Sequence, residues 1–121
     1  MKISEADITR AVTSWMDRHD IKWWRMPLGA VMHQIGGKMV YKKNPLKGFP
    51  DIAGVLKRRD KGRFFAIELK TKTGKLSPEQ IMWQMALEES GAAVAVVRSI
   101  EDLETFFRGV EEVPTALSCG A

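Results

Sequence analysis

The sequence predicts an α/β fold, a mixed β-sheet flanked by helices. Three observations support it: apolar residues recur at helical spacing near the N-terminus, short apolar runs bounded by Gly and Pro fill the middle, and helix and strand patterns alternate towards the C-terminus. The 121 residues, 45% hydrophobic and 28% charged, suffice for one domain, predicted over residues 1–109, with a loose tail over 110–121.

The first element is predicted to be a helix that begins after Ser4 and ends near Asp20. Ser4 is an N-cap residue, and Asp7 three positions later makes a capping-box-like start. One apolar stripe at helical spacing is formed by Ile8, Val12, Trp15 and Met16.

Residues 22–56 are predicted to hold several strands. A strand starts at residues 22–25, and residues 29–31 either continue it or begin another. The Gly36-Gly37 pair predicts a hairpin that returns over 38–41. Two prolines and a glycine mark 44–50 as a loop, and 51–56 is predicted as a core strand.

The clearest strand pattern covers residues 63–71. Because strand side chains alternate between faces, Phe65, Ile67 and Leu69 share one face, and Phe64, Ala66, Glu68 and Lys70 share the other. The short charged turn at 57–62 makes this strand an antiparallel neighbour of 51–56.

A second helix is predicted from Ser77, with Pro78 in its first position, Gln80 completing a capping box and Gly91 as its stop. Its apolar side is predicted to be Ile81, Met82, Met85 and Ala86. Residues 92–97 are typical of a buried strand, and Ser99 caps a last helix that contains Leu103, Phe106 and Phe107.

Basic residues are concentrated in one part of the chain. Residues 38–75 hold twelve Lys and Arg against three acids, whereas the rest holds seven against twelve. This segregation fits either a solvated basic face or a polyanionic partner such as nucleic acid. Two of the three acids, Asp51 and Glu68, are also candidate site residues, and this favours nucleic acid as the partner.

The sequence argues against a membrane protein, a secreted protein and a protein held together by disulfides or by zinc. No apolar run approaches the length of a membrane span, and the N-terminus has no hydrophobic signal segment, so a cytoplasmic protein with no membrane partner is expected. Cys119 is the only cysteine, which excludes an intramolecular disulfide and argues against a Cys-based zinc site.

Asp51, Glu68 and Lys70 are predicted to form a metal-dependent nuclease site. The antiparallel pairing brings Asp51, at the start of one strand, beside Glu68 at the end of the next. Two carboxylates would hold Mg²⁺ or Mn²⁺, with the carbonyl of Leu69 as a further ligand. Lys70 would orient or deprotonate the attacking water, or stabilise the transition-state charge.

Four segments resemble the VRR-NUC domain, a branch of the PD-(D/E)xK nuclease superfamily with a restriction-endonuclease-like core. They are Gly-Phe-Pro-Asp-Ile at 48–52, Ala-Ile-Glu-Leu-Lys at 66–70, Lys-Leu-Ser-Pro-Glu-Gln at 75–80, and residues 93–103. The resemblance implies an αβββαβ core and a catalytic triad of Asp51, Glu68 and Lys70. It adds Gln80 and Glu5 to the site. It also implies a DNA-repair-type homodimer, of bacterial or phage-infected cells, that cuts branched DNA such as four-way (Holliday) junctions.

Several positions keep a second interpretation. Gln80 is also a capping residue, and an acid such as Glu5 is favoured in a first helical turn by the helix dipole. Lys72 and Lys75 either contact phosphates or are solvated loop lysines. Arg25, beside two tryptophans, and Lys47 are further candidates for contact with nucleic acid.

Three other functions remain open from the sequence. The first is a sequence-specific, restriction-type endonuclease, which needs an element for base readout that 121 residues leave little room for. The second is a non-catalytic or partner-dependent DNA-binding module. The third is a nuclease that acts on RNA.

Overall fold

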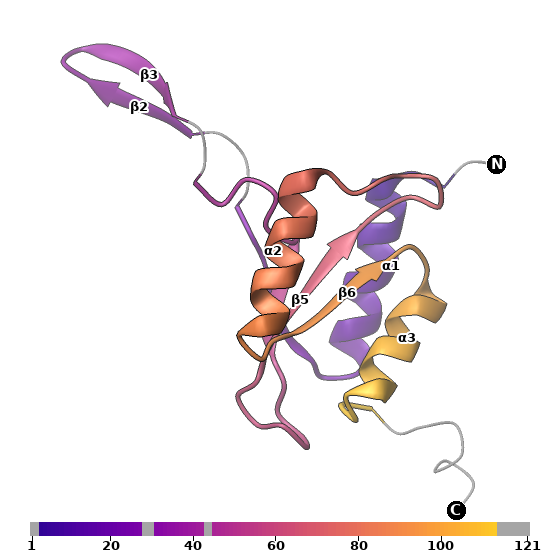
Figure 1. Cartoon of the computed structure of the whole chain (residues 1–121). Helices are drawn as coiled ribbons and strands as arrows, with labels where there is room; N and C mark the ends of the chain where they lie inside the picture. The colour runs from indigo at the N-terminus through magenta and orange to yellow at the C-terminus, as the bar shows by residue number, and fades with distance from the viewer. Residues whose placement is uncertain (1–2, 28–30, 43–44, 114–121) are drawn as a thin grey trace, which may run out of the picture.

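A computed structural model describes residues 3–27, 31–42 and 45–113 of the chain (Figure 1). Its elements are α1 (Glu5–Arg18), β1 (Lys22–Arg25), β2 (Val31–Ile35), β3 (Lys38–Lys42), β4 (Ile52–Val55), β5 (Phe64–Leu69), α2 (Pro78–Glu89), β6 (Ala93–Val97) and α3 (Ile100–Gly109). The predicted αβββαβ core is confirmed as α1, β1, β4, β5, α2 and β6, with α3 added at its end.

The main sheet is mixed, with strand order β1-β4-β5-β6. The first three strands are antiparallel neighbours, and β6 runs parallel to β5. Ile52 pairs with Ile67, so the beginning of β4 lies beside the end of β5. The antiparallel pairing expected from the short turn is therefore confirmed.

The two faces of the sheet are covered unequally. Helices α1 and α3 pack together on one face, and α2 lies on the other (Figure 1). The core lies on the α1/α3 side, where Phe65 of β5 meets Phe107 of α3 with 5.3 Å between ring centroids. Ile67 and Leu69 are buried in the same cluster with Val12 and Met16, as the alternation along β5 predicted.

All three predicted helix caps are present. The Ser4 and Ser77 hydroxyls accept the amide protons of Asp7 and Gln80 in complete capping boxes. Ser99 accepts the amide proton of Asp102 at the start of α3.

Helix α2 packs on a different side from the one predicted. The expected packing residues Ile81, Met82, Met85 and Ala86 are exposed, and Trp83, Gln84 and Leu87 are half-buried instead. Polar contacts fix this rotation: Gln80 donates to Glu68, and the Trp83 indole N–H donates to the carbonyl of Lys47 at 3.0 Å. The apolar side of the helix therefore points away from the sheet.

Strands β2 and β3 form a hairpin of their own. Gly36 and Gly37 join them with φ values of +58° and +78°, which a two-residue turn of this type requires. Within the described residues the hairpin contacts no other helix or strand, and it projects from the body of the molecule (Figure 1).

The chain stays packed beyond the predicted boundary at Gly109. The buried carboxylate of Glu112 accepts the amide protons of Lys57 at 2.8 Å and Arg58 at 2.9 Å, and Val113 joins the core. Positions 114–121, including Cys119, and the first part of the 29–31 segment lie outside the described residues. No helix in the described part of the chain is long and apolar enough to cross a membrane.

Candidate active site

Asp51 joins the beginning of β4 to the end of β5. It follows the buried Pro50 and is itself half-buried. Its Oδ2 accepts the amide proton of Leu69 at 2.9 Å, and its own carbonyl accepts the amide proton of Met26 at 2.9 Å. The carboxylate is thus held at the sheet edge where β5 ends.

Glu68 is the most deeply buried carboxylate of the site, with 3% of its surface exposed. Its Oε1 accepts a hydrogen bond from Gln80 Nε2 at 2.5 Å. Its Oε2 is buried and has no hydrogen-bond partner among the described residues. Burial and the nearby charge of Asp51 raise the pKa of Glu68 to about 8, against the opposing effect of the Lys70 ammonium.

Gln80 serves as both cap and site residue. Its side-chain Oε1 accepts the Ser77 amide proton at 2.8 Å, its backbone N–H donates to the Ser77 hydroxyl at 3.2 Å, and its side-chain Nε2 donates to Glu68. A single amide side chain therefore uses its acceptor for the helix start and its donor for the carboxylate. The N-terminus of α2 is positioned by this contact at the end of β5.

The loop before Asp51 is fixed against the same end of α2. Gly48 has φ +87°, and a Cβ at this position would lie 2.6 Å from Glu79 Cβ and 2.7 Å from the Glu79 carbonyl carbon. The contact between Trp83 and the Lys47 carbonyl lies directly beside it. Only glycine satisfies both the backbone angle and the close approach.

Gly48→Ala is expected to lower the free energy of unfolding by about 2–4 kcal/mol, through backbone strain and overpacking together. Gly62→Ala is the matched control, because Gly62 has φ +81° but nothing within 4 Å of the added Cβ. The control should lose only the strain component, about 1 kcal/mol. Urea unfolding of both variants measures the difference, and equal losses would contradict a tight contact between the loop and α2.

Lys70 and Glu5 lie close enough to influence Glu68. Lys70 is half-buried, follows the end of β5, and donates its amide proton to the Val97 carbonyl at 3.1 Å. Its charge lowers the pKa of Glu68, whereas the charge of Glu5 raises it. Glu5 is exposed in the first turn of α1 and makes no direct hydrogen bond to Glu68 in the described structure.

The basic candidates lie around this site rather than in it. Lys72 and Lys75 are exposed in the loop between β5 and α2. Arg25 is exposed on β1, and Lys47 is exposed with its Nζ 3.9 Å from Glu79 Oε1. None of the four side chains contacts a site carboxylate through an ion pair within the described residues.

One residue that organises the loop was missed by the sequence interpretation. Arg98 follows β6, and its Nη1 donates to the carbonyls of Thr71 and Gly74, each at 2.7 Å. This guanidinium shapes the loop that carries Lys72 and Lys75. A signal was available, because an arginine directly after a strand parallel to β5 lies beside the end of β5.

The donor set fits a hard divalent cation. Within the described residues, no three His, Cys, Asp or Glu side chains form a group that could hold a metal ion. The neighbouring side chains of Asp51 and Glu68 supply two carboxylates. The unpartnered, buried Oε2 of Glu68 is a polar atom that lacks the partner its burial requires. Two carboxylates with water completing the shell are typical of Mg²⁺.

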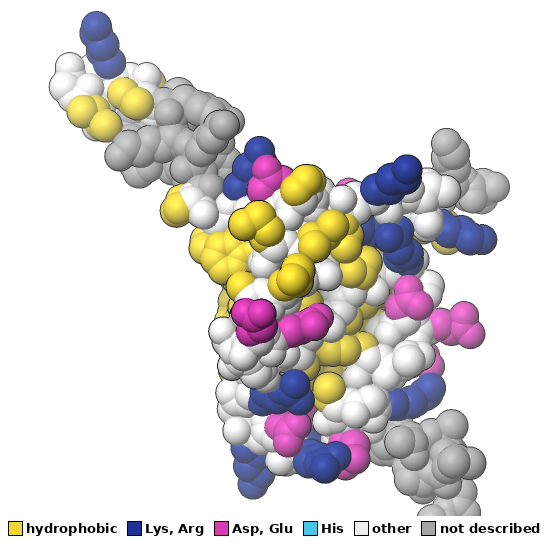
Figure 2. Space-filling view, in the orientation of Figure 1, with side chains coloured by type: hydrophobic (Ala, Val, Ile, Leu, Met, Phe, Trp, Pro, Cys, Tyr) yellow, Lys and Arg dark blue, Asp and Glu magenta, His cyan; other side chains and the backbone are white. Residues whose placement is uncertain are grey.

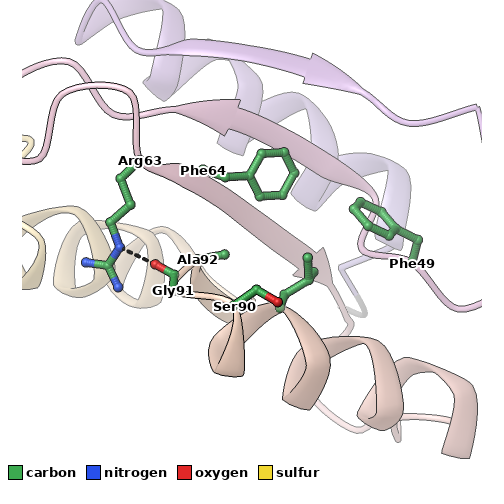
Figure 3. Close-up of a pocket in the computed structure, with 7 residues that line it drawn as sticks. Phe49, Arg63, Phe64, Ser90, Gly91 and Ala92 are labelled. Atoms are coloured by element: carbon green, nitrogen blue, oxygen red, sulfur yellow. Dashed lines mark hydrogen bonds between the residues drawn. The ribbon is translucent and has the colours of Figure 1, made fainter.

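One apolar cavity lies away from the candidate catalytic residues. A cavity of about 480 Å³ lies between Phe64 at the start of β5, Phe49 and the C-terminal end of α2, with Arg63 at its edge (Figure 3). No predicted catalytic residue lines it. The candidate site therefore lies at the polar end of β5 and not in this apolar cavity.

Comparison with known proteins places the chain in a family. No curated protein and no solved structure matches it. The family model of the VRR-NUC domain matches residues 4–101, which include all the elements from α1 to β6 and every candidate site residue. The chain therefore belongs to the VRR-NUC family and is a nuclease domain whose substrate is DNA.

Proposed function

We propose that this protein is a Mg²⁺-dependent, structure-specific DNA endonuclease that acts as a homodimer on branched DNA such as four-way junctions. The observation that carries the proposal is the meeting of Asp51 and Glu68 at the end of β5, with Glu68 buried and one of its oxygens unpartnered. Such a carboxylate pair is costly to maintain unless a cation or a reaction uses it.

Asp51 and Glu68 would hold the cation, with the Leu69 carbonyl as a further ligand. Bound there, Mg²⁺ supplies Lewis-acid polarisation of the phosphodiester and neutralises developing charge, and Mn²⁺ would substitute. Gln80 fixes the orientation of the Glu68 carboxylate through the 2.5 Å hydrogen bond. Because Asp51 accepts the Leu69 amide proton through Oδ2, its other oxygen is left for a ligand.

Lys70 would act on the water or on the transition state. It lies two residues after Glu68, directly beyond the end of β5, and its charge acts on that carboxylate. An ammonium at this position can orient the attacking water or stabilise the negative charge that develops on the phosphate. Glu5 would add a further negative charge beside the site, and Lys72, Lys75, Arg25 and Lys47 would contact the DNA backbone.

The second candidate, a sequence-specific restriction-type endonuclease, gains support from one observation. The β2–β3 hairpin is an element free of the body, and a two-stranded ribbon fits the major groove, where bases can be read. Lys38 and Met39 are exposed on its returning strand. The proposed junction preference and this alternative predict different substrates.

A substrate panel separates them. Labelled four-way junction, flap, linear duplex, single-stranded DNA and single-stranded RNA would be incubated with the protein in Mg²⁺. Junction cleavage at a rate well above that of every linear substrate supports the proposal. Cutting of linear duplex at a defined sequence supports the restriction-type candidate, and binding without cutting leaves a non-catalytic module.

A further inference from the structure

The β2–β3 hairpin carries exposed apolar side chains on both of its faces. Opposed residues of an antiparallel pair share a face, so Ile35 lies on one face with Lys38, and Met39 lies on the other with Gln34. Ile35 is 51% exposed and Met39 is 61% exposed, because the hairpin contacts no other helix or strand of the described structure. An isolated two-stranded hairpin is marginally stable in water. Apolar groups on both faces therefore indicate a ribbon that a partner encloses from two sides.

The chain around the hairpin is basic throughout. Residues 21–50, which include both strands, hold six Lys or Arg and no Asp or Glu. Lys38 is exposed beside the turn, and Figure 2 shows apolar and basic side chains at the projecting end of the hairpin. Helix α2, which also has exposed apolar side chains, holds Glu but no Lys or Arg. Phosphates are therefore attracted to the hairpin, whereas a second copy of the same hairpin would be repelled.

The hairpin leaves the sheet at the end where the candidate site lies. It is inserted between β1 and β4, and the last residue of β1, Arg25, pairs with the first residue of β4, Ile52. Directly beyond this pair, the Met26 N–H donates to the carbonyl of Asp51 at 2.9 Å. DNA contacted by the hairpin is thereby brought to the end of the sheet where Asp51 and Glu68 lie.

We propose that the tip of the hairpin inserts Ile35 and Met39 between the bases at the branch point of a branched DNA, while Lys38 contacts the neighbouring phosphates. Apolar side chains that enter a base step act as wedges and hold the two sides of the step apart. A thin ribbon with one such side chain on each face fits between two separated base pairs, so each face is covered by one of them. Reading of bases in a groove would instead require polar side chains that match their edges.

The inference rests on the proposed endonuclease function and supplies a physical cause for its preference for branched DNA. Inserting a wedge into a continuous duplex costs the stacking energy of the step that it opens. At a branch point the stack is already interrupted, so the same insertion costs less there. The apolar tip therefore favours the branch, and the lysine contributes attraction that is the same for every DNA.

Binding of the full chain to a four-way junction in Ca²⁺ tests the inference without cleavage. The fluorescent base 2-aminopurine, which brightens when it is unstacked, is placed either at the branch point or in the middle of one arm. Wild-type protein should brighten the branch-point probe and leave the arm probe unchanged. Ile35→Thr/Met39→Gln should abolish the brightening and weaken junction binding by about 10-fold or more, with duplex binding unchanged.

Three further variants serve as controls. Ile3→Thr makes the same change at a residue that is 66% exposed ahead of α1, and it should behave as the wild type. Met39→Leu keeps the apolar tip and should retain the branch-point brightening. Lys38→Gln should weaken junction and duplex binding alike, lower the slope of log Kd against log salt by about 1, and keep the brightening at saturation.

The inference is overturned if the bound wild-type chain leaves the branch-point probe dark, or if the double variant brightens it as the wild type does. Equal losses of junction and duplex binding in the double variant would overturn it too, because the hairpin would then be a general or groove contact. The nuclease proposal is judged separately, by cleavage in Mg²⁺. Branch insertion by a chain that cuts no DNA would refute the catalytic proposal alone, and junction cleavage without branch insertion would refute the inference alone.

Discussion

Glu68→Gln is expected to lower the rate of metal-dependent junction cleavage by about 1,000-fold or more, because it removes one of two carboxylates that hold the cation. The amide keeps the shape of the side chain, and its oxygen can still accept the hydrogen bond from Gln80. The variant should therefore fold normally. Single-turnover cleavage in Mg²⁺, beside circular dichroism, measures both effects.

The same substitution is expected to change how stability depends on pH in the absence of metal. The pKa of Glu68 is raised from the ordinary value of 4.5 to about 8 in the folded chain. Between these values the folded state holds a proton that the unfolded state has released, so stability falls as the pH rises from about 5 through 8. Each unit of difference corresponds to about 1.4 kcal/mol, so the loss amounts to a few kcal/mol.

Glu68→Gln should remove this dependence. In EDTA the variant should be more stable than the wild type at pH 9 and closer to it at pH 5. Urea unfolding at pH 5, 7 and 9 measures the two profiles. Parallel profiles would mean that Glu68 is not the buried acid that causes the pH dependence of stability, whatever its role in catalysis.

Lys70→Met is the second change with a large expected effect, again a loss of about 1,000-fold in cleavage rate. It removes the ammonium and retains an unbranched chain of similar length. Lys72→Met is the matched control, because Lys72 is an exposed lysine two residues further on. The control should cut at a rate within about 10-fold of the wild type and show only weaker, more salt-sensitive DNA binding.

Binding measurements make the Lys70 test sharper. If Lys70 acts in the reaction, Lys70→Met should bind junction DNA about as well as the wild type in Ca²⁺ or EDTA. Equal losses of cleavage for Lys70→Met and Lys72→Met would instead assign both lysines to DNA binding. The catalytic triad would then lack its lysine.

The sequence predicted the part of the fold that depends on local patterns. Alternation along β5 separated Phe65, Ile67 and Leu69 from the site face, and the capping residues marked the starts of all three helices. The short turn between β4 and β5 was enough to place Asp51 beside Glu68, because antiparallel neighbours bring the start of one strand to the end of the other.

The rotation of α2 could not be predicted in this way. Its most apolar residues were expected to face the sheet, but the helix turns them outwards. Hydrophobic spacing weighs burial alone, whereas the helix is oriented by a hydrogen bond from Gln80 to Glu68 and by Trp83 against the Lys47 carbonyl. Those partners are distant in sequence. No local pattern showed that the hairpin contacts no other helix or strand of the described structure, or that Glu112 accepts the amide proton of Lys57.

The most direct test of the central claim is cleavage of a labelled four-way junction by the wild-type chain and Glu68→Gln, each in Mg²⁺, Mn²⁺ and EDTA. The proposal predicts cutting by the wild type in either metal, none in EDTA, and almost none by Glu68→Gln under any condition. Cutting that persists in EDTA, or that survives the loss of the Glu68 carboxylate, would contradict a metal-dependent site formed by Asp51, Glu68 and Lys70.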